Sequence, residues 1–165
     1  MIDQNYIYEK IISLLDDNLA DYRLFSHKEA LTYSELEEVQ KEAGFSGAEM
    51  KCMVLKADTK LIVYITLQGN RLSFDAIKER LKVKKVRLST EDELKEYFGA
   101  KPGCAYPFGF DSRYDIYVNP RIYEEEWLLF SPLLATKTIQ TKGSDLKKIL
   151  DSLENKVEEA LNFDL

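Results

Sequence analysis

The chain has 165 residues, of which 45% are hydrophobic and 32% are charged, and its net charge is −6. This length and composition predict one globular domain over residues 1–165. The acidic balance argues against general affinity for nucleic acid and against DNA as a partner, because phosphate binding normally requires a basic surface; a small basic patch on an acidic body remains compatible with it.

The first two predicted helices lie near the N-terminus. Apolar residues spaced i, i+4, i+7 and i+8 predict a helix over 3–17, with Ile7, Ile11, Leu14 and Leu15 on its buried face. A second helix begins at a capping box, in which Thr32 accepts from the backbone N–H of Glu35 and the Glu35 carboxylate reaches back. Its predicted apolar stripe consists of Leu36, Val39 and Ala43, and Gly44 is the predicted stop.

The middle of the chain predicts a β-hairpin. The segments 51–57 and 60–67 are apolar and β-branched, and two turn residues separate them. Both strands have the composition of strands that are buried on two faces. A short helix over 73–81, a strand at 84–89 and a helix that begins at a second capping box, Thr90 to Glu93, are predicted to follow.

The C-terminal third predicts short strands and one more helix. The strands are expected at 114–118, 126–130 and 136–140. The helix is expected to begin near Ser144, with Leu146, Ile149, Leu150, Leu153 and Val157 on one face. The interleaved elements predict an α+β (mixed α/β) fold, and closing the strands into a barrel would explain why several of them look buried on both sides.

The residue counts exclude several classes of site and segment. With His27, Cys52 and Cys104 as the whole inventory of histidine and cysteine, a four-ligand zinc site cannot be filled and a disulfide framework is not expected. Walker A, GxGxxG, GxSxG, HExxH and EF-hand patterns are absent, so no metal or cofactor is predicted. The longest apolar run, 61–67, is too short to span a bilayer, and the N-terminus lacks the pattern of a signal peptide. No membrane partner is expected, and a cytoplasmic location is the default.

The loop at 99–110, "GAKPGCAYPFGF", combines the glycines and prolines of a turn with the side chains of a core. Glycine allows a ligand to approach the backbone closely, and proline makes the turn rigid. Backbone groups held in this way can orient a polar ligand or a water, with Tyr106, Phe108 and Phe110 as apolar walls. The simpler alternative is a tight turn whose aromatic side chains cap the core.

Three other features have both a functional and a structural interpretation. Lys51 opens an apolar strand, where its ammonium can serve as a fixed charge for a phosphate or carboxylate, or can simply be solvated at a strand end. His27 can act as a general base, a common role of histidine side chains, or it can be a structural residue. The segment 78–87 has six basic residues and one acidic residue, and it is either a patch for an anionic partner or a solvated face.

Taken in order, these features resemble the YbaK/prolyl-tRNA synthetase-associated domain family. The resemblance rests on His27–x4–Thr32, a helix, Lys51 at the start of a hydrophobic hairpin, and Gly103–x3–Pro107, and it covers roughly Tyr22 to Leu150. It implies a barrel-like, mixed and largely antiparallel sheet surrounded by helices. It also implies a free-standing protein that hydrolyses the ester of a mischarged tRNA, with Ala or Cys wrongly attached to the proline tRNA as typical substrates.

The same resemblance assigns roles to residues. Lys51 and Gly103 are the implied catalytic positions: Lys51 would anchor the 3′ end of the aminoacyl-tRNA, and the backbone around Gly103 would orient the ester and its water. The implied substrate-binding positions are His27, Thr32, Cys104, Ala105, Tyr106, Pro107, Phe108 and Ser131. Tyr106 and Phe108 would limit the size of the amino acid. In this family the terminal ribose hydroxyl is thought to assist the attacking water, so no catalytic triad is required.

One segment departs from the family patterns. Where one branch has a His-Pro-x-x-Asn segment, this chain has Ser131 and Ala135; a second branch has a serine followed by glycines, and Leu133 does not supply the glycine. These departures motivate the alternative of a non-catalytic module that binds tRNA, an aminoacyl-tRNA synthetase or a small aminoacyl ligand. A hydrolase of another small aminoacyl ester is a third possibility. The amino acid and the tRNA, and the roles of the N-terminal helix and the acidic tail at 151–165, are not assigned.

Overall fold

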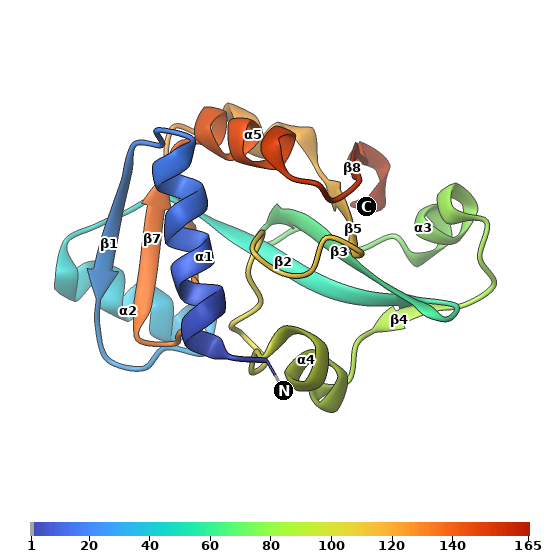
Figure 1. Cartoon of the computed structure of the whole chain (residues 1–165), viewed down its shortest axis with the longest axis horizontal. Coiled ribbons are helices and arrows are strands. Elements are labelled where there is room, and N and C mark those ends of the chain that lie inside the picture. Colours follow the sequence, from blue (N-terminus) through green and yellow to red (C-terminus); the bar gives the residue numbers. More distant parts are fainter. Residues whose placement is uncertain (1) are drawn as a thin grey trace.

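A computed structural model describes residues 2–165. The strands form one eight-stranded sheet, and helices lie around it (Figure 1). The helices are α1 (Gln4–Asp17), α2 (Tyr33–Ala43), α3 (Phe74–Leu81), α4 (Glu91–Phe98) and α5 (Gly143–Ser152), with the 3-10 turns η1 (Pro120–Glu124) and η2 (Leu161–Phe163). The strands are β1 (Tyr22–Ser26), β2 (Ala48–Ala57), β3 (Lys60–Leu67), β4 (Val86–Leu88), β5 (Asp115–Val118), β6 (Leu128–Phe130), β7 (Lys137–Thr141) and β8 (Val157–Glu159). Within residues 2–165, no helix combines the length and the apolar character needed to cross a bilayer.

The sheet is mixed, as predicted. Its strand order is β1-β7-β6-β2-β3-β5-β8, and β4 pairs with β2 beside this path. The pairs β1/β7, β6/β7, β2/β3 and β2/β4 are antiparallel, whereas β2/β6, β3/β5 and β5/β8 are parallel. Within the described residues β1 and β8 are not paired with each other, so the strand path is open and the hydrogen-bonded ring of a complete barrel is not formed.

The β2–β3 hairpin separates two hydrophobic clusters, which confirms that its strands are buried on both faces. Alternate side chains of a strand point to opposite faces. Val54 and Ile65 therefore join the larger cluster with α1 and α5, whereas Leu55 and Tyr64 join a smaller cluster with Ile77 of α3. The hairpin is consequently the central layer of the molecule, and it carries Lys51 near one end.

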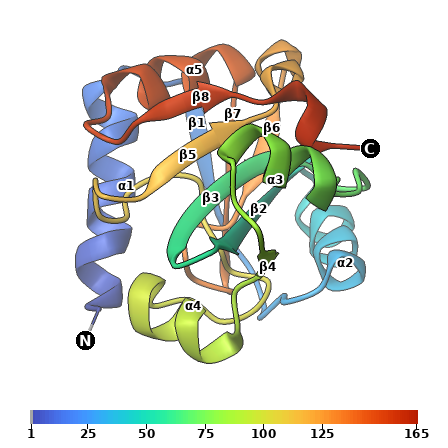
Figure 2. The same cartoon turned by 90° about the vertical axis from the view of Figure 1, so that its right-hand side faces the viewer.

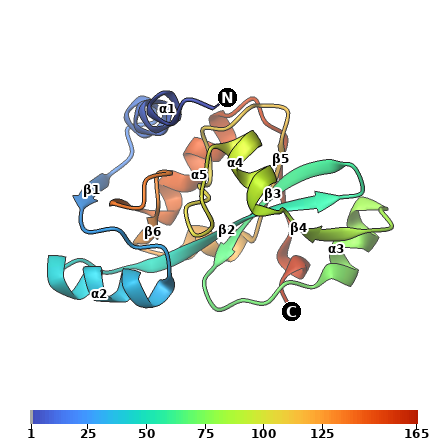
Figure 3. The ribbon, with the colours of Figure 1, turned by 90° about the horizontal axis from the view of Figure 1, so that it is seen from below.

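Local capping signals fix the helix ends where the sequence predicts them. Thr32 and Thr90 each form a complete capping box with the glutamate three residues later, and Gly44 and Gly99 end α2 and α4 in the left-handed conformation. The predicted stripe of α2 is only partly correct. Val39 is buried, but Ala43 is exposed, because α2 lies at the edge of the molecule and buries a narrow face (Figure 3).

The C-terminal region differs most from the prediction. The last helix ends at Ser152, because the chain turns extended at Leu153, and Val157 lies in β8 rather than on the helix. Strand β8 pairs with β5 beside α5 (Figure 2), and Phe163 is fully buried in the smaller cluster. The segment 157–165 is therefore an integral part of the sheet and core. Strand β1, which pairs with β7, was also not predicted.

Candidate functional site

Strand β2 has a gap in its pairing on one side. It pairs with β6 only at Ala48 and Glu49, and with β4 only from Leu55 to Ala57. The hydrogen bonds in the two paired stretches that border the gap include those from Ala48 N to Trp127 O and from Ser89 N to Val54 O, both 2.9 Å long. Between them, residues 50–53 form an open strand edge in the middle of the sheet.

Backbone polar groups of β2 face this gap. Both groups of a given residue in an antiparallel strand point to the same neighbour, and successive residues alternate. Ala48 and Val54 bond on the β6/β4 side, so Cys52, which lies between them in the same register, directs its N–H and C=O to that side. No strand within residues 2–165 pairs with Cys52 there. These groups are available to a ligand, as in β-strand addition.

A cleft of about 250 Å³ occupies the gap. Its lining comes from residues 31–33 and Leu36 at the start of α2, residues 49–53 of β2, Gly103 and Ala105 of the loop, and Phe130 and Ser131 at the end of β6. The structure thus places Lys51, Gly103, Thr32, Ala105 and Ser131 around one cavity, although they are far apart in sequence. This volume lies just below the roughly 300–1,000 Å³ of sites for drug-sized ligands, so it suits a small aminoacyl group better than a whole nucleoside.

Gly103 closes one wall of the cleft. Its φ is +89°, a conformation that side chains other than glycine rarely adopt, and a Cβ atom at this position would collide with the carbonyl oxygen of Leu31. The loop can approach the start of α2 closely only because residue 103 has no side chain. Glycine is therefore required here by geometry.

Lys51 is half-buried, and its ammonium is held in place. Nζ donates a hydrogen bond of 3.0 Å to the backbone oxygen of Asn70, in the turn after β3. An ammonium has three N–H donors, and this is the one hydrogen bond that the structure gives Nζ within residues 2–165. The charge is thus oriented while donor capacity remains for an anionic ligand.

Glu49 is a cleft residue that was not predicted. It precedes Lys51 by two positions and so lies on the same face of β2. Its Oε1 accepts from Gln40 Nε2 at 2.9 Å, and burial raises its pKa to about 7. Burial likewise raises the pKa of the neighbouring Tyr33 to about 12, with smaller contributions from Cys52 and Glu49. The alternation of Glu49 and Lys51 was the available sequence signal, but the strand was predicted to begin only at residue 51.

Four residues predicted to bind substrate lie in the core rather than on the cleft: Cys104, Tyr106, Pro107 and Phe108. The Tyr106 hydroxyl donates to Phe98 O at 2.8 Å, and the Phe108 ring packs edge-on against Phe130 with centroids 5.5 Å apart. Large apolar rings gain more from core burial than from a wet cleft. The aromatic side chains therefore support the cleft wall from behind and do not form its surface.

His27 also lies away from the cleft lining. Its Nε2 is 2.8 Å from Thr138 Oγ1 and its Nδ1 is 2.7 Å from Lys28 O, so both ring nitrogens have protein partners. This arrangement matches the structural interpretation of His27. Thr32 does line the cleft, but its hydroxyl is engaged in the capping box with Glu35.

The segment after β6 contains an unusual backbone conformation. Ser131 Oγ donates to Leu134 O at 3.2 Å, and Leu133 is buried with a φ of +77°. Positive φ at a bulky residue is uncommon and is normally occupied by glycine. Leu133 therefore adopts a backbone conformation typical of glycine in the segment where one family branch has glycines.

No metal cluster is evident in the described part of the chain: within residues 2–165, no three His, Cys, Asp or Glu side chains are grouped so that they could hold an ion. The charged groups of the cleft lining are the Lys51 ammonium and the Glu49 carboxylate, and backbone N–H and C=O groups and side-chain hydroxyls lie beside them.

Comparisons with known proteins identify the class to which this open-edged mixed sheet with its lysine cleft belongs. Residues 27–149 match the family model described as aminoacyl-tRNA editing domain. The chain belongs to this family, which confirms the resemblance to the YbaK/prolyl-tRNA synthetase-associated domains.

Individual relatives are more distant. Over 85 residues, or 51% of this chain, the sequence is 26% identical to a proline–tRNA ligase of Bacillus licheniformis, and the match spans 15% of that enzyme's length. A crystal structure of a hypothetical protein superposes with a TM-score of 0.73 at 16% identity, covering 91% of this chain and 97% of the other. A crystal structure of a candidate trans-editing enzyme for prolyl tRNA synthetase gives 0.71 at 13% identity, covering 93% and 95%. At these identities the two structures establish the shared fold.

Proposed function

We propose that the protein acts in trans as an aminoacyl-tRNA deacylase, which hydrolyses the ester that joins a wrongly attached amino acid to the 3′ end of a tRNA. The observation that carries this proposal is the convergence of Lys51, Gly103 and the open edge of β2 on one small cleft. An aminoacyl ester is already activated, so orientation of the ester and a water can supply much of the catalysis.

The two charged groups of the cleft fit the two ends of such a substrate. The Lys51 ammonium binds a phosphate of the tRNA 3′ end, and the Glu49 carboxylate accepts hydrogen bonds from the α-ammonium of the amino acid. Residues two apart on a strand have Cα atoms about 7 Å apart, so the two charged side chains start close enough together to serve one small substrate. The N–H of Cys52, one residue beyond Lys51, faces the cleft and is suited to bind the carbonyl oxygen as negative charge develops on it.

In the reaction, water adds to the ester carbonyl carbon and the bond from that carbon to the ribose oxygen breaks. The free amino acid leaves, and the ribose oxygen takes up the proton that the water loses. The cleft volume of about 250 Å³ favours a small amino acid such as Ala or Cys. Size alone discriminates weakly, at about 1–3 kcal/mol per methylene.

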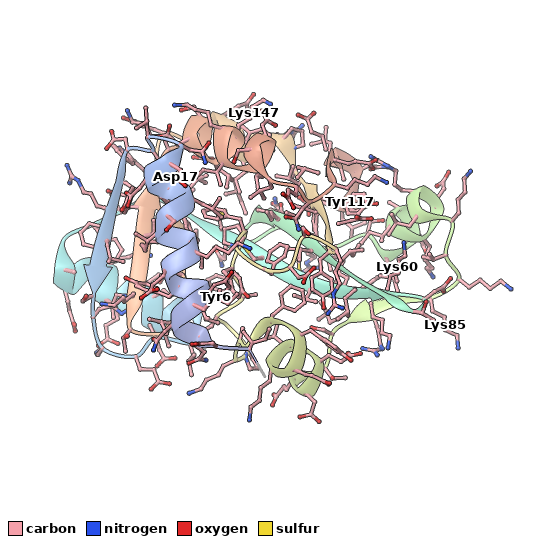
Figure 4. The ribbon with its side chains drawn as sticks, viewed as in Figure 1. Tyr6, Asp17, Lys60, Lys85, Tyr117 and Lys147 are labelled. Atoms are coloured by element: carbon pink, nitrogen blue, oxygen red, sulfur yellow. The ribbon has the colours of Figure 1, made fainter. Side chains whose placement is uncertain are left out.

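A basic surface supports tRNA as the carrier of the ester. Six of the chain's 23 basic residues lie within 78–87, from α3 to β4. The backbone N–H groups of Lys84 and Lys85 both donate to the Asp58 carboxylate, which fixes this segment to the tip of the β2–β3 hairpin. Lys60 and Lys85 project at that end of the molecule (Figure 4). Phosphate contacts there would make binding weaken as salt increases.

A deacylation panel tests the proposal. Purified protein is incubated with tRNAs carrying each amino acid, including Ala and Cys on the proline tRNA, and ester loss is measured. We expect at least one substrate to be cleared and Lys51→Ala to reduce the rate about 100-fold or more, in line with loss of a positioned charge. Lys41→Ala, which removes an exposed lysine of α2, is the matched control. Persistence of every ester would refute the enzymatic function.

The second candidate is a binding module of the same fold without turnover. This candidate is favoured by the hydrogen bond of Ser131, because a hydroxyl that donates to Leu134 O within its own turn is engaged there and not with a substrate. This candidate predicts salt-sensitive tRNA binding, or capture of a synthetase, together with a silent panel.

A further inference from the structure

The acidic C-terminal segment packs against the turn that holds Lys51. Ser73 N donates to Phe163 O at 2.7 Å and Leu165 N donates to Arg71 O at 2.8 Å, with Asp164 bridged to Leu72 between them. Phe163 is fully buried. Its ring lies 5.3 Å, centroid to centroid, from each of Tyr64 and Tyr117. The segment 163–165 is therefore docked as a short antiparallel partner of residues 71–73.

Asp164 is the polar centre of this contact. Its Oδ2 accepts three hydrogen bonds, from Thr66 Oγ1 at 2.6 Å, Asn119 Nδ2 at 2.7 Å and Asn70 Nδ2 at 3.1 Å. These donors come from β3, from the residue that follows β5, and from the turn after β3. Hydrogen bonds to a charged acceptor are stronger than neutral ones, so one carboxylate oxygen ties three parts of the chain together.

Asn70 connects this centre to the cleft. Its side chain is held by Asp164 and Thr66, and its backbone oxygen accepts from Lys51 Nζ at 3.0 Å. Backbone bonds anchor the turn on either side, from Gln68 N to Glu49 O at 2.9 Å and from Leu165 N to Arg71 O at 2.8 Å. At Asn70 itself the backbone N reaches Leu67 O only at 3.3 Å, and the adjacent Gly69 has a φ of +99° and open space around its Cβ position. The two side-chain bonds of Asn70 therefore help to fix the position of its carbonyl.

We propose that Asp164 is a positioning residue for Lys51, which acts through Asn70; the functional consequence rests on the deacylase function proposed above. A lysine side chain has four rotatable bonds and loses rotamer entropy when it is fixed. The chain Asp164–Asn70–Lys51 fixes it before substrate arrives. The segment that carries Asp164 lies about 110 residues beyond Lys51 in sequence, and within residues 2–165 it contributes nothing to the cleft lining.

The test measures the mobility of Lys51 directly, without substrate. Protein labelled with ¹³C at the lysine ε-carbons is examined by NMR relaxation, with the Lys51 signal assigned from Lys51→Arg. Asp164→Ala removes the centre of the contact. Asn70→Ala removes only the link, since Thr66 and Asn119 still bond to Asp164. Leu165→Ala, whose side chain is 85% exposed, is the matched control. We expect Lys51 to become more mobile in both test variants and to remain unchanged in the control.

Deacylation provides the second measurement. Because Lys51 anchors the substrate, we expect kcat/KM to fall roughly 10-fold in Asn70→Ala, mostly through KM and with an unchanged pH profile. An unaltered Lys51 signal in folded Asn70→Ala would overturn the proposal, even if Asp164→Ala does not fold. Increased Lys51 mobility together with a wild-type protein that clears no ester would refute the deacylase function but leave the positioning of Lys51 established.

Discussion

The loop 103–110 and the segment 157–165, which contains β8 and η2, differ in how they serve the Lys51 cleft. The loop 103–110 supplies part of the cleft wall itself, through Gly103 and Ala105. Within residues 2–165, the segment 157–165 supplies none of the lining, and Asp164 is linked to Lys51 through Asn70. One segment is rich in glycine, proline and aromatic residues, whereas the other contains three acidic residues.

The two segments are anchored in the same way despite this difference. Each buries one phenylalanine completely, Phe108 in the larger cluster and Phe163 in the smaller one. Burial of a phenylalanine side chain contributes roughly 1.5–3 kcal/mol. A short segment becomes part of the fold when one large side chain is buried and its backbone groups are paired. The average composition of the segment does not predict this.

The largest expected effect comes from removing these anchors. Phe108→Ala and Phe163→Ala should each cost about 3–5 kcal/mol of unfolding free energy. We expect the loss at Phe108 to be global, because the larger cluster joins α1, β3 and α5. The loss at Phe163 should first release the segment 157–165, since residues 163–165 are docked by short-range contacts with residues 71–73.

Urea unfolding and amide hydrogen exchange distinguish the two outcomes. In Phe163→Ala, the amides of Ser73 and Leu165 should exchange through a local opening whose free energy is lower than that of global unfolding. Leu161→Ala, at a half-exposed position in the same segment, should change stability by no more than about 0.5 kcal/mol. Full protection of both amides in Phe163→Ala would show that the segment is not an independent unit.

A smaller effect is expected at Gly103, on the loop side of the comparison. Gly103→Ala combines a φ of +89° with a collision against Leu31 O, and we expect a cost of about 1–3 kcal/mol and displacement of residues 31–33 into the cleft. Gly44→Ala is the matched control, because Gly44 has a φ of +75° but no atom within 4 Å of its Cβ position. It should show only the backbone strain, about 1 kcal/mol. Equal losses in the two variants, measured by urea unfolding, would exclude the contact with Leu31.

Local signals in the sequence predicted most of the fold. The capping boxes at Thr32 and Thr90 and the two-residue turn of the β2–β3 hairpin depend on a few neighbouring residues, and the structure confirms them. Strand β8 was missed because three residues that pair in parallel with β5 carry no local signal. Val157 continued the helical spacing of α5, so periodicity alone placed it on the helix.

The site was only partly predictable for the same reason. Lys51 and Gly103 stand out by residue type at a strand start and in a turn, and the structure places both on the cleft. The availability of Cys52 backbone groups depends on where β4 and β6 stop pairing with β2, which no local pattern encodes. The backbone of Leu133 was also not predictable, because a leucine side chain gives no indication of the left-handed φ of +77° at this position.

The smallest expected effect concerns Glu49, on the β2 side of the cleft. Burial raises its pKa to about 7 from an ordinary 4.5, so the folded protein binds this proton more tightly than the unfolded chain does. The stabilisation is therefore complete below about pH 4.5, decreases as pH rises to about 7, and is absent above that. A rise from 4.5 to about 7 corresponds to about 3.4 kcal/mol at 1.36 kcal/mol per pKa unit. Because Glu49 is partly exposed and solvent screens its charge, we expect the dependence to amount to about 1–2 kcal/mol.

Glu49→Gln should flatten this part of the stability curve, measured by urea unfolding at several pH values between 4.5 and 8. Glu38→Gln is the control, because Glu38 is exposed and its ion pair with Lys28 lowers its pKa, so its contribution changes with pH in the opposite direction. The pH dependence of activity should be opposite to that of stability. Because the ionised carboxylate binds the α-ammonium, clearance of an ester with a free amine should rise as pH increases through 7. Clearance of the N-acetyl analogue, which has no α-ammonium, should not change over this pH range. Equal loss of both substrates in Glu49→Gln would assign Glu49 a role other than recognition of the amine.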